Sequence, residues 1–434
     1  MAPLEIAGLG LGALFVLILL QIPIGFALII VGIVGFALQI DWAPALTFLA
    51  KEPAAWLSSV DLATLPLFLL MGAFANVAGF SSDIYKAAAA LLGHRRGGLA
   101  YATITGCAAF GAICGSTLAT AAAFTKIALP EMEKRGYTAR FSTGTIAAGG
   151  ALKALIPPSL LMILYCVIAK AFIFDLFIAA VIPAVITLTL NAGAIAISVR
   201  LNPELAPISP HVPWRERLSL LGNATPALAM MATIFVGLYS GIFTVNEAAS
   251  VACVLSLAFA LVRRRLSWNS FRAALLEAAG ASMVLYIVII GANTFSYFVT
   301  AGQVPEALIG LIGGLHLAPL AVIGMFLLAY LVLGMMFDEA SAIVITLPIV
   351  LPVVVSLGYD PIWWGVINVI LVEIAIIHPP FGVIVFVIHG LRPDIPMARI
   401  YRGVLPFLVA DFVVIFLLIA FPQLALWLPK LLTH

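Results

Sequence analysis

Charged side chains are scarce in this sequence. They make up 9% of its 434 residues, while 64% of the residues are hydrophobic; a soluble globular domain carries about 25% charged residues. A water-soluble protein is therefore excluded. The formal net charge of +2 is too small for a nucleic-acid-binding surface, so we expect no nucleic-acid partner.

Cysteine and the common catalytic motifs are also scarce or missing. The four cysteines, Cys107, Cys114, Cys166 and Cys253, form no C-x-x-C pair and lie in apolar segments, so we expect small packing residues and no disulfide. Neither H-E-x-x-H nor G-x-S-x-G occurs, and both are signatures of hydrolytic sites. We therefore predict no enzyme and no metal centre of His, Cys and carboxylate ligands.

Long runs of apolar residues are abundant in the sequence. They cover residues 9–38, 176–199, 224–243 and 406–428, and a membrane-spanning helix needs about 20 mainly apolar residues. An outer-membrane barrel would instead show short alternating segments. The first run is longer than the apolar part of a signal peptide and lacks a basic start, so we expect it to be membrane structure. The sequence predicts an all-α, multi-pass protein of the lipid bilayer.

Positive residues cluster in five short segments: 94–96, 131–140, 200–217, 263–265 and 392–402. Lys and Arg concentrate in cytoplasmic loops, so we place all five on the cytoplasmic face of the membrane. The chain has no Lys or Arg between Arg272 and Arg392. The connections near 303–305 and 358–361 are therefore expected on the outer face.

One apolar segment, at about 99–130, has basic residues on both sides. A single crossing would leave its two ends on opposite faces. Two short helices that meet at residues 111–116 return both ends to the same face, and glycine permits the tight tip. We predict a re-entrant hairpin, called hairpin one.

An internal repeat links the two halves of the chain. An offset of 222 superposes seven identical residues: Ile127 on Ile349, Leu129 on Leu351, Pro130 on Pro352, Gly136 on Gly358, Tyr137 on Tyr359, Pro157 on Pro379 and Pro158 on Pro380. The same offset places hairpin two at about 319–352, whose flanks lack positive charge. We therefore predict inverted repeats, with halves at 1–199 and 218–434 and a cytoplasmic linker at 200–217.

Each predicted hairpin is followed by a double proline, at 156–159 and 378–382. Proline frees backbone carbonyls one turn back, and unwound carbonyls suit a bound cation; a simple packing kink is the alternative. Asp338, an ionisable group at membrane depth, is a functional candidate, or a cap for the next helix. The predicted ion-binding positions are Gly115, Ser116, Thr120, Pro157, Gly334, Asp338, Ser341, Pro379 and Gly382. Thr117 either contributes a hydroxyl or bonds back to its own helix.

Several short motifs together resemble the large membrane (M) subunits of TRAP transporters, in the ion-transporter superfamily. The resemblance covers nearly the whole chain. It rests on Ile-Pro-Ile-Gly at 22–25, residues 66–72, 96–100, 115–116, 128–132 with 136–137, 156–159, 244 with 247–249, 334 with 338, 372–374, 379–382 and 404–407.

This resemblance implies an elevator-type carrier, with a scaffold domain and a transport domain that holds both hairpins. It also implies coupling to Na⁺, a small four-helix membrane subunit, and a periplasmic substrate-binding protein that delivers a small organic anion. We therefore predict a sodium-coupled importer of a carboxylate or sugar acid. A stand-alone carrier or exchanger coupled to protons, using His378 and Glu373, is the alternative.

The sequence departs from the family pattern at three positions: Thr120 where many members have Asp, Lys153 where Gly is frequent, and His378 where Thr is usual. Lys153 is open to three interpretations: a counter-charge for the substrate, an internal cation in place of a sodium ion, or a snorkelling side chain. His378 either binds substrate, titrates or bonds a neighbouring carbonyl. We predict substrate-binding positions at Lys153, Ser159, His378 and Glu339.

Overall fold

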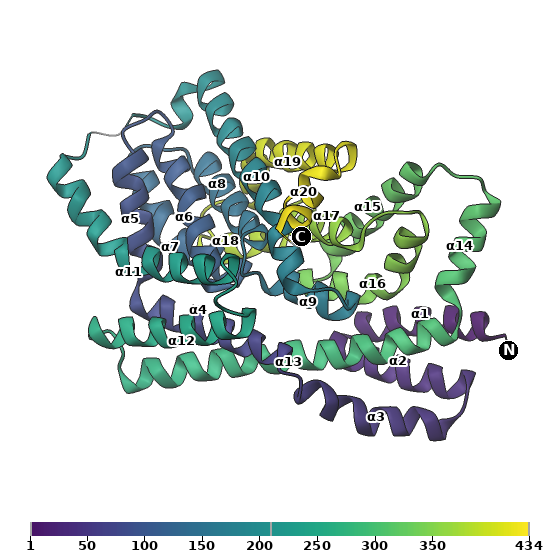
Figure 1. Cartoon of the computed structure of the whole chain (residues 1–434). Helices are drawn as coiled ribbons and strands as arrows, with labels where there is room; N and C mark the ends of the chain where they lie inside the picture. The colour runs from purple at the N-terminus through teal and green to yellow at the C-terminus, as the bar shows by residue number, and fades with distance from the viewer. Residues whose placement is uncertain (1, 209–210, 433–434) are drawn as a thin grey trace.

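The computed structural model describes residues 2–208 and 211–432, so residues 209 and 210 of the expected linker and the outermost positions of both halves lie outside the description. The described residues form helices joined by short connections, without a β-strand (Figure 1). The first half contains α1 (Pro3–Leu19), α2 (Ile24–Gln39), α3 (Trp42–Leu57), η1 (Asp61–Ala63), α4 (Thr64–Ala78), α5 (Phe80–Leu92), α6 (Gly98–Cys114), α7 (Thr117–Lys134), α8 (Ala139–Leu152), η2 (Lys153–Leu155), α9 (Leu160–Ala169) and α10 (Ile173–Leu201).

The second half continues with η3 (Pro203–Leu205), α11 (Trp214–Tyr239), α12 (Val245–Val262), α13 (Trp268–Ala301), α14 (Val304–Gly314), α15 (Pro319–Met336), α16 (Glu339–Ser356), α17 (Pro361–Ala375), α18 (Val383–Leu391), α19 (Met397–Ala420) and α20 (Gln423–Leu432). Both ends of the predicted linker are helical, because α10 runs through Arg200 and α11 begins before Arg217.

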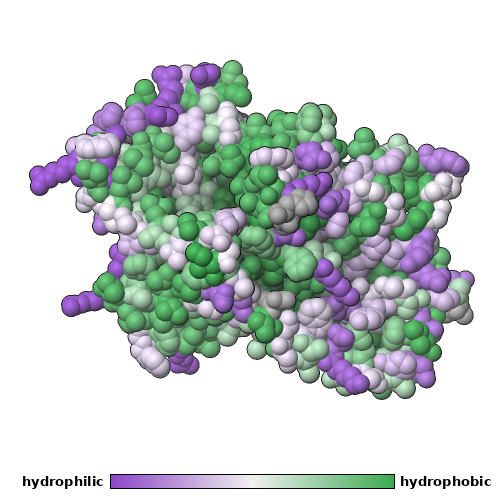
Figure 2. Space-filling model, viewed as in Figure 1, coloured by the Kyte–Doolittle hydropathy of each residue, from purple (hydrophilic) through white to green (hydrophobic). Residues whose placement is uncertain are grey.

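The all-α, multi-pass architecture is confirmed. Within the described ranges, seven helices are long and apolar enough to cross a membrane, or nine if each of two bent pairs counts as one span. Much of the face in Figure 2 is hydrophobic, with hydrophilic residues along its left and right margins and some near its centre. Large apolar side chains exposed on such a surface are suited to lipid or to a second membrane subunit.

The first apolar run, 9–38, is two helices and not one. Gln21, with φ of 61°, reverses the backbone after α1, and Pro23 supplies no amide hydrogen for a continuing helix. The sequence suggested a continuous stretch because Leu20 and Ile22 keep it apolar across the turn. Hydrophobicity alone does not locate such a break.

Helix α13, the longest, lies along one side of the molecule and packs against α2 at one end and α4 at the other (Figure 1). Glycines allow the contact with α2 to be close: a Cβ on Gly32 would lie 2.8 Å from the Thr294 carbonyl carbon, and one on Gly25 would lie 2.8 Å from that of Ile287. Small residues at helix interfaces in membranes permit this approach. Helix α12 completes this layer by packing along α4.

Helices α6 and α7 form an antiparallel hairpin whose two ends meet. The Leu99 amide, at the start of α6, donates a 3.2 Å hydrogen bond to the Tyr137 hydroxyl just beyond α7. At the tip, Gly115 has φ of +70°, which favours glycine, and Ser116 begins α7 as its N-cap. Helices α15 and α16 form the second hairpin, turning at Phe337, with Asp338 as the N-cap of α16.

Both double prolines lie where a helix is interrupted. The chain leaves helical geometry between η2 and α9, with a bend of 41°, and again between α17 and α18. Both Pro-Pro bonds are cis. A further bend of 65° separates α4 from α5 at Gly79, whose φ is +80°.

The basic connections lie close together at one end of the molecule. Arg392 pairs with Glu133 through hydrogen bonds of 2.8 and 2.9 Å, and the Thr138 amide donates to the Leu205 carbonyl at 3.1 Å. The Arg140 side chain reaches the Arg402 carbonyl at 3.3 Å. Segments 131–140, 200–217 and 392–402 are therefore neighbours, as expected for loops on one face of a membrane.

Candidate functional site

Lys153 lies at the tip of the first hairpin. It belongs to η2, just before the first double proline, and only 1% of its surface is exposed. Its stem packs on α6 because Gly111 has no side chain: a Cβ there would lie 2.2 Å from the Lys153 Cβ. Its ammonium donates a 2.7 Å hydrogen bond to the Gly115 carbonyl. The snorkelling interpretation is therefore wrong, since the charge is enclosed by protein.

Two glutamates from the second half face this lysine. Glu373, in α17, is 4% exposed and accepts a 3.1 Å hydrogen bond from the Thr117 hydroxyl at the hairpin tip. Glu339, the first residue of α16, interacts with Glu373, Thr117 and Lys153. We call these four residues the tip junction. It brings together the tips of both hairpins, the break after α8, and α17.

Some polar atoms beside the junction are unsatisfied. The Glu373 Oε2, the Glu339 Oε2 and the Ser159 hydroxyl are buried and have no hydrogen-bond partner in the described structure. Buried polar atoms are nearly always hydrogen-bonded, so atoms of this kind mark positions for a water, an ion or a ligand. Ser159 is fully buried and begins α9 directly after the double proline.

Asp338 caps the N-terminus of α16, which is one of the two roles expected for it. Its Oδ1 accepts hydrogen bonds of 3.1 Å from both the Ala340 and Ser341 amides, and its Oδ2 accepts one from the Ser341 hydroxyl. The residue itself is exposed, whereas Ser341 is buried. Because Asp338 is the cap, Glu339 is the first residue of α16, and its side chain interacts with Thr117 and Glu373.

The hydroxyls of tip one have divided roles. Ser116 caps α7 by accepting a 3.3 Å hydrogen bond from the Ala119 amide. Thr120 donates back to the Ser116 carbonyl at 2.8 Å, which is an ordinary helical use of threonine. The Thr117 hydroxyl donates to Glu373 at 3.1 Å and not to a carbonyl of its own helix, so a role as a site hydroxyl stays a prediction.

The residues predicted around the second double proline lie at the break between α17 and α18. His378 is hydrogen-bonded through Nδ1 to the Pro379 carbonyl, and its ring packs edge-on against Phe412. This contact corresponds to the third interpretation of His378, a hydrogen bond to a neighbouring carbonyl. The Gly382 amide donates to the His378 carbonyl at 3.1 Å. Gly334, in α15, packs against α17 at Ala375.

Sequence reasoning left out two buried carboxylates. Glu373 was considered only for proton coupling, and Asp411, in α19, was not considered. The Asn191 amide nitrogen donates to the Asp411 Oδ1 at 3.2 Å, and a cavity of about 10 Å³ lies between Glu373 and Asp411. The missed signal was an ionisable residue within an apolar helix, which is a functional candidate by default.

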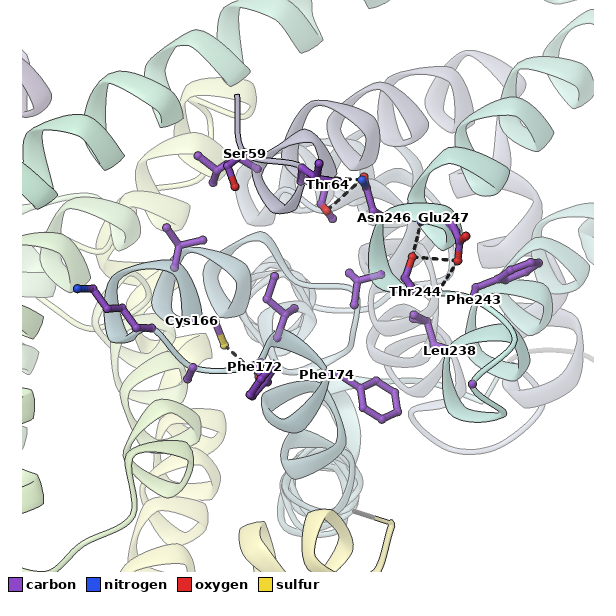
Figure 3. A pocket seen from close by; sticks show the side chains of 18 of the residues that line it. Ser59, Thr64, Cys166, Phe172, Phe174, Leu238, Phe243, Thr244, Asn246 and Glu247 are labelled. Carbon is purple, nitrogen blue, oxygen red and sulfur yellow. Dashed lines mark hydrogen bonds between the residues drawn. The ribbon is translucent and has the colours of Figure 1, made fainter. Parts of the chain in front are cut away.

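A wide cleft of about 860 Å³ opens elsewhere, between the layer that contains α4 and α12 and the connection from α9 to α10 (Figure 3). Phe172 and Phe174 line one side, and Thr64, Thr244 and Asn246 line the other. The Asn246 side chain donates to the Val60 carbonyl at 3.2 Å, and the Thr244 hydroxyl donates to Glu247 at 2.9 Å. None of these residues was predicted from the sequence.

Two hairpins, two helices broken at double prolines and a buried charged junction between them define a multi-pass membrane transporter. The chain belongs to the DctM family: the model described as "Tripartite ATP-independent periplasmic transporter, DctM component" matches residues 11–424. The resemblance to TRAP large permeases is thereby confirmed.

Three relatives illustrate the family. The chain is 34% identical to the C4-dicarboxylate TRAP transporter large permease protein DctM of Pseudomonas aeruginosa, over 85% of this chain and 86% of that protein. It is 32% identical to the ectoine/5-hydroxyectoine TRAP transporter large permease protein UehC of Ruegeria pomeroyi, over 96% and 97%. It is also 32% identical to the isethionate TRAP transporter permease protein DctMQ of Oleidesulfovibrio alaskensis, over 92% of this chain and 62% of that protein.

The fold is similar to that of a solved transporter, YdaH of Alcanivorax borkumensis. The TM-score is 0.59, the sequence identity is 14%, and the match covers 89% of this chain and 91% of that one. At this identity the likeness concerns the fold alone.

Proposed function

We propose that the chain is the large permease subunit of a sodium-coupled importer that takes a small organic anion from a periplasmic binding protein across the bacterial inner membrane. The observation that carries the proposal is the tip junction, where residues from both hairpins meet beside unsatisfied buried polar atoms. Secondary transporters built from inverted repeats bind substrate and ions where discontinuous helices meet. We assign the chain no catalytic reaction.

The proposed substrate class follows from the printed names of two relatives together with the site. A C4-dicarboxylate and isethionate, named for the P. aeruginosa and O. alaskensis proteins, are both small acids. In this chain the fully buried Ser159 hydroxyl has no recorded partner, so it is a donor available to an acid oxygen. Lys153 is a weaker candidate for that role than the sequence indicated, because protein atoms surround its ammonium.

The proposed sodium position in the second half lies at tip two. Asp338 is exposed at the head of α16, and hard oxygen ligands such as carboxylates and carbonyls suit a small cation. Ser341, Gly334, Pro379 and Gly382 remain proposed contributors near the same tip and the following break. The hydroxyls of Ser116 and Thr120 are engaged within α7, so only backbone carbonyls remain at tip one as ligands for a cation.

Alternating access by an elevator movement is part of the proposal. Its support is the wide cleft between the α4–α12 layer and the α9–α10 connection, together with a close backbone approach of that layer to tip one. A Cβ on Gly72 in α4 would lie 2.4 Å from the Cys114 carbonyl oxygen. Such a backbone contact can slide or separate without the loss of a side-chain hydrogen bond at that point.

Large permeases of this family work with a small permease subunit. The longer DctMQ relative, of which this chain covers 62%, supports a small-subunit partner. Exposed apolar side chains on α1–α3, such as Leu19, Leu38 and Leu46, are the surface we propose for this small four-helix subunit.

The test is uptake into proteoliposomes that contain this chain with its small subunit. Radiolabelled C4-dicarboxylate, isethionate and sugar acids would be supplied with and without the binding protein, under an inward sodium gradient or an equal potassium gradient. Uptake that needs both the binding protein and sodium supports the proposal. Equal uptake in sodium-free buffer would refute the coupling, and uptake without the binding protein would refute the dependence on it.

A second candidate, a stand-alone carrier coupled to protons, is favoured by one observation. Glu339 and Glu373 lie together in the tip junction with a single lysine, and two carboxylates at close range in a low-dielectric interior readily share a proton. The same vesicles decide between the candidates. A proton gradient that drives uptake in sodium-free buffer, without the binding protein, would favour the second.

A further inference from the structure

The Lys153 ammonium has the surroundings of a bound cation. Its hydrogen-bond acceptor is a backbone carbonyl at a hairpin tip, that of Gly115 at 2.7 Å, and the charges of Glu339 and Glu373 act on it through space. Carbonyl and carboxylate oxygens are also the ligands of hard metal cations. An unpaired charge in such an enclosed place would be strongly unfavourable, so the lysine and the glutamates stabilise one another.

The internal repeat shows what is special about this position. Adding 222 to 153 gives Ala375. Ala375 is the last residue of α17, and Lys153 directly follows the last residue of α8. In both halves the residue packs against a glycine of the first hairpin arm: Lys153 on Gly111 and Ala375 on Gly334. The two halves therefore share the packing, but only the first half carries a cationic side chain to the tip.

The space for the lysine is built into hairpin one. A Cβ on Gly111 would lie 2.2 Å from the Lys153 Cβ and 3.0 Å from its Cγ, so any larger residue would displace the stem. Gly72 of α4 lies close to the neighbouring Cys114 carbonyl. The ammonium is held at the Gly115 carbonyl, and the side chain as a whole is shielded from water.

We propose that Lys153 is a built-in cation: its ammonium occupies the cation position at the tip of hairpin one, so that this chain binds no sodium ion there. The inference rests on the proposed sodium-coupled function. One positive charge on the side chain replaces one sodium ion at the Gly115 carbonyl, where the charges of the two glutamates act on it. Sodium coupling in this protein is then carried by the second half alone.

The test compares two substitutions of the full chain. Lys153→Ala opens the position, so a sodium ion is expected to enter and replace the lost charge. Lys153→Met also removes the charge but keeps the length of the stem, so the position stays filled. Purified parent and variants would be unfolded by heat in NaCl or KCl at equal ionic strength, because a cation that binds only the folded state raises the unfolding midpoint.

The expected result is an additional sodium-dependent rise in the midpoint for Lys153→Ala, absent from the parent and from Lys153→Met. In proteoliposomes, the Hill coefficient of uptake for sodium should rise by about one in the Ala variant. An Ala variant whose sodium response equals that of the parent overturns the inference, and so does a Met variant that gains the same response as Ala.

Folding failures are also informative. Recovery of Lys153→Ala from membranes solubilised in sodium but not in potassium supports the inference. If Lys153→Ala and Lys153→Gly are recovered in neither salt while Lys153→Met is recovered, sodium does not fit the opened position and the inference fails. The unfolding comparison needs no transport. It therefore remains decisive even if uptake by the parent proves independent of sodium and the proposed coupling is refuted.

Discussion

Thr117 and Glu373, 256 positions apart in the sequence, are joined by a hydrogen bond of 3.1 Å from the threonine hydroxyl to the glutamate Oε1. The bond connects the tip of the first hairpin with α17 of the second half. Both side chains are buried, so the bond is protected from water and relates the two repeats directly. Loss of the donor would leave a buried carboxylate with fewer partners.

Replacement of Thr117 should therefore impair both folding and transport. Thr117→Val keeps the shape but removes the donor, and an unsatisfied buried acceptor costs roughly 1–3 kcal/mol. We expect a lower unfolding midpoint and reduced uptake, while Thr117→Ser retains most of both. Thr189→Val is the matched control, because Thr189 is exposed and bonds only the Val185 carbonyl of its own helix. Parent-like behaviour of Thr117→Val would show that the contact is dispensable.

Gly72 should tolerate no side chain in the conformation of this structure. An added Cβ would lie 2.4 Å from the Cys114 carbonyl oxygen, which is backbone and cannot rotate away. Overpacking typically costs about 1–3 kcal/mol, so Gly72→Ala should lower the unfolding midpoint and slow uptake. Gly280→Ala, in α13, is the control because it meets open space. Equal midpoints for the two variants would argue against this close contact.

The main architectural features could be read from local sequence signals. Apolar length predicts the helices, Gly115 predicts a tight turn, and the double prolines at 157 and 379 predict interruptions. Each of these depends on residues near one another in the chain, and each follows from backbone chemistry. The break at Gln21 escaped notice because its neighbours are apolar and a positive φ at glutamine has no strong sequence signature.

The partners within the site could not be predicted in the same way. That Lys153 would reach Gly115, and Thr117 would reach Glu373, depends on how distant helices are rotated about their axes. Membrane helices with apolar residues on every side give little indication of which face is buried. The capping of α16 by Asp338 was foreseen as an alternative because it is local. Asp411 was overlooked although an isolated aspartate in α19 was visible in the sequence.

Arg392 is expected to hold two connections between helices together. It forms hydrogen bonds of 2.8 and 2.9 Å with Glu133, beyond which α7 ends, and also pairs with Asp394. These side chains are partly exposed, at 28% for Arg392 and 31% for Glu133, so solvent screens the pairs and Arg392→Ala should cost about 1 kcal/mol or less. Arg399→Ala, at an exposed position, is the control. Identical unfolding midpoints for the two variants would exclude a structural role for the pair.

The same cluster gives a pH dependence of known sign. Hydrogen bonding from Arg392 lowers the pKa of Asp394 below its ordinary value of 3.8. A carboxyl whose pKa is lower in the folded state stabilises the fold above the unfolded pKa, and this contribution is lost as pH falls through the folded pKa. The difference in unfolding midpoint between parent and Asp394→Asn should therefore be constant above about pH 5 and shrink below about pH 3.8. A difference that grew on acidification would contradict the pairing.

Asp338 allows the proposed sodium ligand to be separated from its capping role. Asn and Asp are comparable N-cap residues, whereas Ala at an N-cap costs about 0.5–2 kcal/mol. Asp338→Asn should therefore fold like the parent, since its side-chain oxygen still accepts from the Ala340 and Ser341 amides, while Asp338→Ala should unfold at a lower temperature. If the negative charge holds a sodium ion at tip two, both variants should lose most sodium-dependent uptake, and the sodium-induced rise in the unfolding midpoint should disappear in the Asn variant. Normal uptake and an unchanged sodium response in Asp338→Asn would show that Asp338 only caps α16. The sodium ligands would then be backbone carbonyls of tip two.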